Sequence, residues 1–334
     1  MRDGTPTLGR IVESFFRDTL ATQRRASPRT VASYRDSLKL FLVFVSKRKG
    51  RPPSSLTVAD LDADELVAFL SYVEAERGCS IATRNVRRTA LRTFFRHVGY
   101  QDPGALGVVE RALLVPAKRC DLAPIDFLRP DEQEPLLAAP DRSTVLGRRD
   151  YAMLLFLVRT GARESEVVTV DVKHARRELP RQVLLFGKGS KQRVVPLCDA
   201  TTDALGRMLA DRPEVRADRP LFAGRDTKRM TRHGVIHVVH RHAVTAATKQ
   251  PSLGQRSVTP HLLRHTCAMN LLRSGVDLTT IRGWLGHVSV QTTHMYIEAD
   301  TEMKRKALEH CAVTVPEVRR FEAPDSVLAM LEAL

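Results

Sequence analysis

Four short segments between residues 160 and 296 hold side chains whose types and spacing suit chemistry at a phosphate group. In the segment 259–266, Pro260 predicts the start of a helix. His261 and Arg264 then lie three residues apart on the same side of that helix. An imidazole and a guanidinium that share one face can both donate to an anionic oxygen. A buried structural histidine is the alternative interpretation of His261.

The second segment, residues 186–193, predicts a basic β-hairpin. Gly187 and Gly189 permit a tight turn between two short apolar runs, and the tip presents Lys188 and Lys191. The spacing GxxxxGK[ST] is absent, so this is not a nucleotide-binding P-loop. A basic loop without a special role remains an alternative.

The other two segments are each modest alone. Gly161 predicts the end of one helix, and Arg163 opens the next with Glu166 three residues on. This pattern also fits a capping glycine followed by a surface ion pair. The fourth segment contains Leu285-Gly286-His287 and then Tyr296, which could equally be a core aromatic residue.

The charge of the chain favours a polyanionic partner. Its 53 Lys and Arg exceed 38 Asp and Glu, the net charge is +15, and the pI is about 10.1. More than half of this excess falls in residues 1–120. Each cation on a phosphate releases a condensed counterion, so nucleic acid is the expected partner. An Arg-rich protein without such a partner is the alternative.

An arginine stripe marks the helix that Ser80 opens. Arg84, Arg88 and Arg92 recur every four residues with Arg87 beside them, and no acidic residue is interleaved. The stripe is either a DNA-backbone contact or a solvated face. The further candidate DNA contacts are Lys191, Arg193, Arg232 and Arg241.

The periodicity predicts a mainly α protein with a small β-sheet. Helices fill residues 11–100, with starts at Ser27-Pro28, Asp62 and Ser80 and an end at Gly50. An apolar helix follows at 150–158, then two short strands at 183–186 and 193–197, and helices return from Thr231. The expected organisation is a helical domain at 1–105, a linker at 106–127, a second domain at 128–312 and a tail at 313–334.

Neither a metal nor another cofactor is expected. The five cysteines are scattered without CxxC spacing, which argues against disulfides and a thiolate zinc site and for a reducing compartment. His233, His237, His240 and His242 cluster, but no Cys or acidic residue lies among them. No signal peptide or membrane span is evident, so we expect the cytoplasm.

Taken in order, the motifs TGxR, GKG, HxxR, LGH and a tyrosine nine residues later resemble the tyrosine recombinase family, which includes phage integrases. The stretch Ser27–Thr30 with Tyr34, Leu38 and Phe41 resembles the core-binding domain of that family. The resemblance covers roughly residues 8 to 310. Ala162 departs from the larger apolar residue that is usual there, and 313–334 follow no pattern of the family.

The resemblance implies a helical-bundle core-binding domain, a mixed α/β catalytic domain and a set of catalytic positions. The matching residues are Arg163, Lys188, His261, Arg264, His287 and Tyr296, with Glu166 in support of the first arginine. By this resemblance Tyr296 is the nucleophile, the arginines stabilise charge on the phosphate, and Lys188 is the general acid. His261 accepts a proton or holds the phosphate, and His287 holds it.

The resemblance further implies a site-specific DNA recombinase that works through a 3′-phosphotyrosyl intermediate, in integration, excision or transposition of a mobile element. The alternatives are an Xer-like dimer-resolution recombinase, a DNA-binding protein without catalysis, and relaxation of supercoils. The implied partners are double-stranded DNA recombination sites, three further protomers in a homotetramer and accessory recombinases, at the nucleoid and not at a membrane. The tail at 313–334 either docks on a neighbouring protomer or packs on its own domain.

Overall fold

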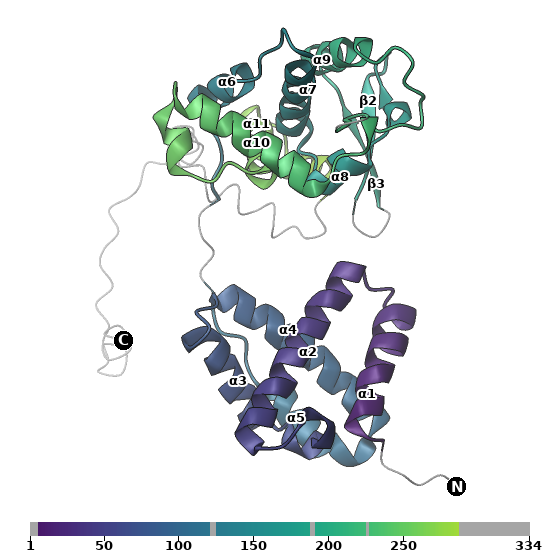
Figure 1. The fold of residues 1–334 in the computed structure, drawn as a ribbon, viewed down its shortest axis with the longest axis vertical. Helices are drawn as coiled ribbons and strands as arrows, with labels where there is room; N and C mark the ends of the chain where they lie inside the picture. Colours follow the sequence, from purple (N-terminus) through teal and green to yellow (C-terminus); the bar gives the residue numbers. More distant parts are fainter. Residues whose placement is uncertain (1–5, 121–124, 188–190, 225–226, 287–334) are drawn as a thin grey trace, which may run out of the picture. The chain divides into compact units, whose positions relative to one another are not determined.

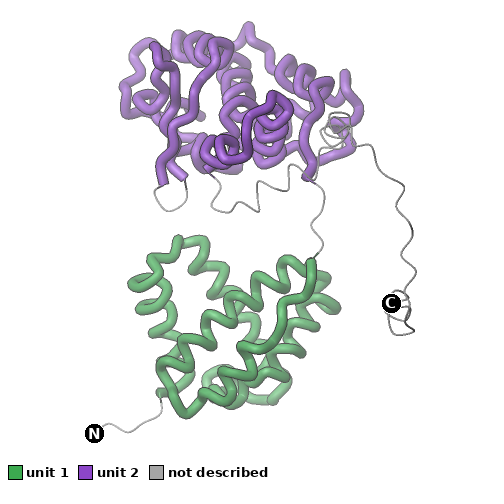
Figure 2. Tube along the Cα trace, turned by 180° about the vertical axis from the view of Figure 1, so that it is seen from behind, with its two compact units in different colours: residues 1–123 green, residues 124–334 purple. Residues whose placement is uncertain are grey.

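The chain folds into two compact units, residues 1–123 and 124–334 (Figures 1 and 2). The structure is a computed structural model that describes residues 6–120, 125–187, 191–224 and 227–286. The expected fold class is confirmed, because the protein is mainly helical and its sheet is small. In these ranges no helix is both long and apolar enough to cross a lipid bilayer.

The first unit consists of helices. In order they are α1 Leu8–Ser14, a π-helix Phe15–Gln23, α2 Pro28–Lys49, α3 Ala63–Ala75, α4 Ile81–Gln101 and α5 Leu106–Leu114, with short 3₁₀ turns at Pro53–Ser55, Val58–Asp60 and Pro103–Ala105. Their apolar faces meet in one core that includes Phe15, Phe41, Phe69 and Phe94.

The predicted helix starts of this unit are confirmed by their caps. The side chains of Ser27, Asp62 and Ser80 each accept a hydrogen bond from a backbone N–H in the first turn of α2, α3 and α4. The predicted end of α2 is also confirmed, since Gly50 adopts the left-handed conformation at φ 65°.

Helix α5 lies inside the stretch that we expected to be a linker from residue 106. Its residues Val109 and Ala112 are buried in the core of the first unit, together with Val115 just after it. The sequence pattern did not reveal this helix because glycines and prolines surround it. Its apolar residues pack on α3 and α4. The packed part of the first unit therefore extends past residue 105.

The second unit surrounds a small antiparallel sheet with helices. Its elements are α6 Pro130–Ala138, α7 Val145–Thr160, α8 Glu164–Thr169, a 3₁₀ turn Val172–His174, β1 Ala175–Arg176, β2 Gln182–Phe186, β3 Gln192–Pro196, α9 Asp199–Ala210, α10 Arg232–Ala247, a 3₁₀ turn Pro251–Gln255, α11 Pro260–Arg273 and α12 Leu278–Leu285. Helix α7 is buried along most of its length and packs against α9 and α11.

The predicted hairpin is confirmed. Strands β2 and β3 pair antiparallel, with Val183 opposite Val195 and Phe186 opposite Gln192. Alternation buries Val183 and Leu185 on one face of β2. The sequence did not predict β1, whose two residues form the third strand beside β2. Such a short edge strand leaves too little pattern to recognise.

Candidate active site

Arg163 stands between two helices and is held by its own neighbour Glu166. Its backbone N–H donates to Oε2 of Glu166 (2.8 Å), and its Nη1 donates to Oε1 (2.9 Å). Gly161 ends α7 in the left-handed conformation and Arg163 precedes α8, so the turn between these helices fixes the arginine backbone. About a third of the side chain of Arg163 is exposed (32%). The side chain of Arg163 is therefore only partly enclosed by the protein.

Arg193, at the start of β3, is the second cation on Glu166. Its Nη1 and Nη2 donate to the two carboxylate oxygens (2.5 and 2.7 Å), and its Nε donates to the carbonyl of Trp284 (2.8 Å). This corrects the expectation that Arg193 is a DNA contact, because its side chain is only 9% exposed and is engaged inside the protein. The sequence carried no sign of this role beyond the position of Arg193 in the hairpin.

The carboxyl of Glu166 stays ionised between the two arginines. Burial alone would raise the pKa of Glu166, but the hydrogen bonds and charges of Arg193 and Arg163 outweigh it and hold the pKa below its usual range. The ion pair of Arg163 and Glu166 is thus no surface salt bridge, which was the alternative interpretation of this segment, because Glu166 is 1% exposed.

Arg264 is buried (2% exposed) and bridges the ends of two helices. Its Nη1 donates to the carbonyl of Gly161 (2.7 Å) and its Nη2 to the carbonyl of Leu285 (2.5 Å). Arg163 donates to the next carbonyl along the chain, that of Gly286 (3.1 Å). The two predicted catalytic arginines, far apart in sequence, are therefore brought together.

Three consecutive carbonyls at the end of α12 each accept from a different arginine. Trp284 receives Arg193, Leu285 receives Arg264 and Gly286 receives Arg163. The last carbonyls of a helix lack intrahelical partners and carry the negative end of its dipole, so cations stabilise them. Leu285 and Gly286, the described residues of the LGH motif, thus lie where three segments of the chain meet.

Gly161 and Gly286 permit this close approach. Both have positive φ, at 62° and 64°. A Cβ on Gly161 would lie 2.5 Å from Cδ2 of Leu285, and one on Gly286 would lie 3.2 Å from Cδ of Arg193. A side chain at either position would force the side chain of Leu285 or of Arg193 to move.

His261 is exposed and lies in the first turn of α11. The charges of Arg264 and Arg163 act on its ring. Partial burial and then the charge of Arg264 lower the pKa of His261, with a smaller effect of Arg163. The pattern of a buried structural histidine does not fit this exposure. A ring that is neutral near pH 7 can accept a proton.

His265 makes an edge contact with His261, and the sequence analysis missed it. The ring centroids are 4.3 Å apart at an interplanar angle of 74°. Burial lowers the pKa of His265 to about 4, with smaller contributions from His261 and Arg264. The HxxRH spacing of one helical turn was the available signal for this contact.

Three of the predicted catalytic residues, Lys188, His287 and Tyr296, lie outside the described residues. Gly187 precedes Lys188, and a Cβ built on Gly187 would lie 3.4 Å from Oε1 of Glu166 and 3.8 Å from Nη1 of Arg163. The base of the hairpin tip therefore adjoins the arginine cluster. Lys191, at the other side of the tip, is exposed.

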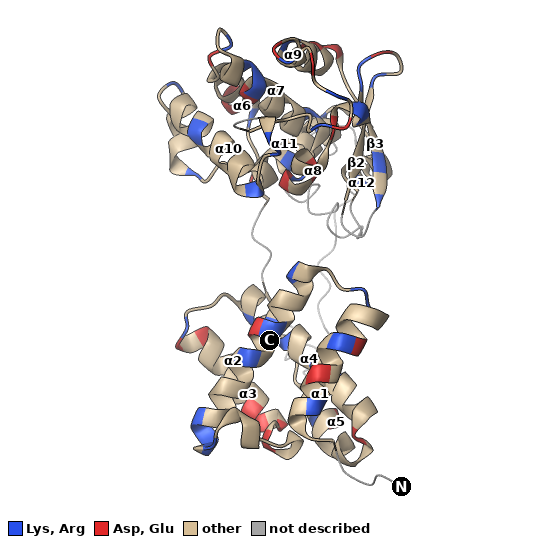
Figure 3. Cartoon of the chain, turned by 45° about the vertical axis from the view of Figure 1, so that its right-hand side comes forward, with Lys and Arg blue, Asp and Glu red and all other residues tan. Residues whose placement is uncertain are grey.

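The arginine stripe of α4 is only partly available for DNA. Arg88 is buried and donates to the carbonyl of Val115 (2.6 Å), which corrects its prediction as a DNA contact. Arg84 lies 3.6 Å from Glu74 of α3, so a carboxylate from another helix replaces the missing acidic residues on α4. Arg87 and Arg92 are half-buried, and neither Nε has a hydrogen-bond partner within the described ranges. Acidic residues lie among the basic ones in both units (Figure 3).

Helix α10 carries the other two predicted DNA contacts and the histidine cluster. Arg232 is exposed, whereas Arg241 forms an ion pair with Asp150 of α7. His242 is buried and also bonds Asp150 (2.9 Å). Among the residues that the structure describes, no three His, Cys, Asp or Glu side chains gather as a metal site would require.

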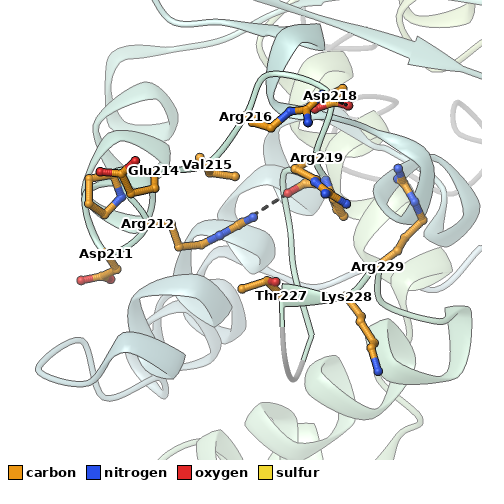
Figure 4. A pocket seen from close by; sticks show the side chains of 12 residues that line it. Asp211, Arg212, Glu214, Val215, Arg216, Asp218, Arg219, Thr227, Lys228 and Arg229 are labelled. Atoms are coloured by element: carbon orange, nitrogen blue, oxygen red, sulfur yellow. Dashed lines mark hydrogen bonds and ion pairs between the residues drawn. The ribbon is translucent and has the colours of Figure 1, made fainter.

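A separate hollow of about 730 Å³ lies between residues 211–220 and 227–229 (Figure 4). Three of the cations that line it have partners within the protein. Arg212 donates to the carbonyls of Pro220 and Leu221, and Arg216 pairs with Asp218. Arg229 pairs with Asp171 (2.6 Å). Of the predicted catalytic residues that the structure describes, none lines this hollow.

Two family models match most of this chain. Residues 126–303 match the model of the phage integrase family, and residues 13–104 match that of the phage integrase N-terminal SAM-like domain. The chain is 40% identical over 98% of both lengths to "Putative integrase/recombinase y4rC" of Sinorhizobium fredii. It is 35% identical to tyrosine recombinase XerC of Rhodospirillum centenum, covering 90% of this chain and 89% of that one.

The fold resembles those of solved recombinases. XerH site-specific recombinase, bound to palindromic difH substrate in a post-cleavage complex, matches with a TM-score of 0.71 at 23% identity, over 89% of this chain and 84% of that one. Tn1549 transposon integrase, in complex with transposon right end DNA, matches with a TM-score of 0.69 at 16% identity, over 92% and 100%. At these identities the likeness establishes the fold.

The chain belongs to the phage integrase family of tyrosine recombinases. Members of this family break and rejoin DNA, and the activity of the protein is site-specific recombination.

Proposed function

We propose that Tyr296 attacks a DNA phosphate and forms a 3′-phosphotyrosyl intermediate while Arg163 and Arg264 stabilise the charge on the phosphorus oxygens. The convergence of these two arginines at the end of α12 is the observation that supports this most. A guanidinium stays charged at any physiological pH and presents a planar fork to phosphate oxygens. Such fixed charges are the largest contribution to many phosphoryl and acyl transfers.

The other residues of the site transfer protons, hold the phosphate or orient an arginine. The tyrosine is neutral at pH 7, since its ordinary pKa is about 10. His261, whose pKa is lowered by burial and by Arg264, accepts its proton or holds the phosphate. Lys188 protonates the departing 5′ oxygen, and His287 donates to a phosphate oxygen. Glu166 orients Arg163.

The enzyme acts on paired double-stranded DNA sites as a homotetramer. The ester to Tyr296 conserves the bond energy, so a 5′ hydroxyl from a partner duplex can reseal the strand without ATP. The helical unit and the catalytic unit, joined through the part of the predicted 106–127 linker that follows α5, clamp the duplex. The tail at 313–334 docks on a neighbouring protomer, and accessory recombinases act beside it. Because its substrate is chromosomal or element DNA, the protein works at the nucleoid in the cytoplasm.

The biological role is integration, excision or transposition of a mobile element. The relative with 40% identity over nearly the whole chain is named an integrase/recombinase. Xer-like dimer resolution is the second candidate, which the identity of 35% to a XerC recombinase favours.

Covalent capture on DNA tests the proposal. The wild type is incubated in EDTA with nicked duplexes of randomised sequence, and adducts that survive SDS are isolated and sequenced. We expect an adduct on Tyr296 that Tyr296→Phe does not form, although this variant still binds the captured duplex. An adduct of equal yield with Tyr296→Phe, or none with the wild type, contradicts the proposal. The captured sequence then separates the roles, because element ends indicate mobility and a chromosomal dimer-resolution site indicates the Xer-like role.

A further inference from the structure

Arg193 links three elements of the catalytic unit with one side chain. It leaves β3, grips both oxygens of Glu166 at 2.5 and 2.7 Å, and caps the carbonyl of Trp284 at 2.8 Å. All three nitrogens of its guanidinium donate within the protein, and 9% of the side chain is exposed. A guanidinium so enclosed has little surface to offer to DNA.

The partner of Arg193 is the residue that holds Arg163. One oxygen of Glu166, Oε1, accepts from Nη1 of Arg193 and from Nη1 of Arg163 (2.9 Å). The carboxylate is 1% exposed, so its charge depends on these two cations. Removing one partner from a buried charged cluster leaves an uncompensated charge. Without Arg193, either Glu166 takes up a proton or Arg163 alone must neutralise it.

We propose that Arg193 is a positioning residue of the recombination reaction, which acts through Glu166 and the end of α12 to hold the guanidinium of Arg163 toward the scissile phosphate. This inference rests on the role of Arg163 given under the proposed function. It distinguishes Arg193 from Lys191, two residues earlier in the same hairpin, which is exposed and free to meet DNA.

The experiment compares Arg193→Gln with a matched control, Arg148→Gln. Arg148 also forks on a carboxylate, that of Asp211 (2.7 and 2.6 Å), and also donates to a carbonyl, that of Ser143 (2.8 Å). It lies in the same unit and outside the site. Both variants lose an arginine that bridges a carboxylate and a carbonyl, so they share any general cost to folding.

The readouts are the single-turnover rate of adduct formation and the affinity, on a nicked duplex of the sequence captured with the wild type. Rates are expressed per molecule that binds this duplex. We expect Arg193→Gln to slow adduct formation by about 100-fold or more, as for one lost oxyanion donor. The Kd of Arg193→Gln for this duplex should stay within about threefold of the wild-type value, because the enclosed guanidinium of Arg193 makes no DNA contact that the substitution would remove. Arg148→Gln should retain the wild-type rate, and Arg193→Lys, which keeps the charge without the fork, should lie between.

A double variant and a pH profile test the route through Glu166. Adduct formation by Arg193→Gln with Glu166→Gln should be no slower than by Arg193→Gln alone, because no buried carboxylate is left to neutralise. Within the described residues Arg163 and Arg193 are the charged groups that bond Glu166. The rate of Arg193→Gln should therefore rise with pH as Glu166 ionises, and the double variant should lose this rise.

Three results would overturn the inference: equal rate losses in Arg193→Gln and Arg148→Gln, a loss in Arg193→Gln that is entirely one of affinity, or losses that multiply in the double variant. Each is read against a wild type that forms the adduct. If the wild type forms none, or Tyr296→Phe forms one, the proposed function itself has failed, and that outcome is distinct from a failure of Arg193.

Discussion

Two arginine-rich regions of this protein look alike in sequence and behave differently in the structure. On α4, Arg84 and Arg88 each find a separate partner, Glu74 and the carbonyl of Val115. At the end of α12, Arg163, Arg193 and Arg264 come from three segments and donate to three successive carbonyls. The first region uses arginine to join helices. The second gathers positive charge at one place.

The difference shows that the spacing of arginines along a helix does not establish a phosphate site. What distinguishes the α12 cluster is that its members converge, that Arg163 and Arg193 share one buried carboxylate, and that Arg163 stays partly exposed. The α4 stripe follows a regular spacing of four residues, yet burial withdraws Arg88 from it. Convergence of segments, which the sequence does not display directly, is the more informative property.

Substitution of Arg264 should cause the largest loss of stability, because this residue holds the α12 cluster together. Arg264→Ala leaves the carbonyls of Gly161 and Leu285 without their donor and opens a cavity where a buried side chain stood. We expect the free energy of unfolding to fall by about 3–5 kcal/mol, because two buried carbonyls each lose a donor at about 1–3 kcal/mol and the cavity adds to this loss. Urea denaturation measures this loss.

Arg88→Ala is the matched change in the other region. It removes one buried bond, to Val115, and should cost about 1–2 kcal/mol. If Arg264→Ala and Arg88→Ala lose the same free energy of unfolding, the arginines of the two regions do not differ in how strongly they stabilise the fold.

Gly161→Ala should disturb the cluster without removing a charge. The residue has φ 62°, and its new Cβ would meet Cδ2 of Leu285 at 2.5 Å, so the buried Leu285 side chain or α12 must shift. We expect a loss of about 1–3 kcal/mol in thermal or urea unfolding, together with slower cleavage. Gly78→Ala in the first unit is the control, because φ is 59° but nothing lies within 4 Å. It should cost about 1 kcal/mol from the backbone alone. A Gly161→Ala variant no less stable than Gly78→Ala would contradict the close approach.

The stability of the catalytic unit should depend on His265 below neutral pH. Its pKa falls to about 4 in the folded protein, against about 6.5 in the unfolded chain. Above pH 6.5 both states are neutral, and the contribution is fully retained. As pH falls from 6.5 toward 4 the unfolded state binds the extra proton, so stability is lost. We expect this loss to be about 1–2 kcal/mol after screening by solvent, and to be absent in His265→Gln. Parallel pH curves for the two proteins would contradict the assignment.

The smallest effects should come from the half-buried residues Arg87 and Arg92 of the α4 stripe and would sharpen the comparison there. Arg87→Gln and Arg92→Gln should each weaken DNA binding and reduce the slope of log Kd against log salt by about 1, as for one lost phosphate contact. Arg88→Gln should leave the slope unchanged, because its guanidinium is bound to Val115. Fluorescence anisotropy at several salt concentrations measures this. A reduced slope for Arg88→Gln would restore it to the DNA-binding face.

The helices were predictable where a cap and a periodic apolar face coincide. Ser27, Asp62 and Ser80 marked their helices because a short polar side chain before a hydrophobic run satisfies free N–H groups. Helix α5 escaped prediction because no capping side chain precedes it and prolines and glycines flank it. Its stability comes from packing in the core, which is a tertiary property.

The site was predictable as a set of residue types but not as a network. Motif order indicated Arg163, His261, Arg264 and Glu166, and the structure brings the two arginines and Glu166 together. Arg193 was assigned to DNA because a cation in a hairpin usually faces solvent. Its true partners lie 27 and 91 residues away in sequence, and no local pattern records such contacts.

The end of α12 also constrains how the chain can change in length. Asp277 begins this helix and Gly286 ends it. Inserting or deleting one residue between them would rotate the last carbonyls by about 100° around the helix axis, so all three guanidiniums would lose their acceptors at once. Substitutions along α12 are therefore easier to accommodate than a change in its register, and natural variation in length should occur in the surface loops of this unit instead.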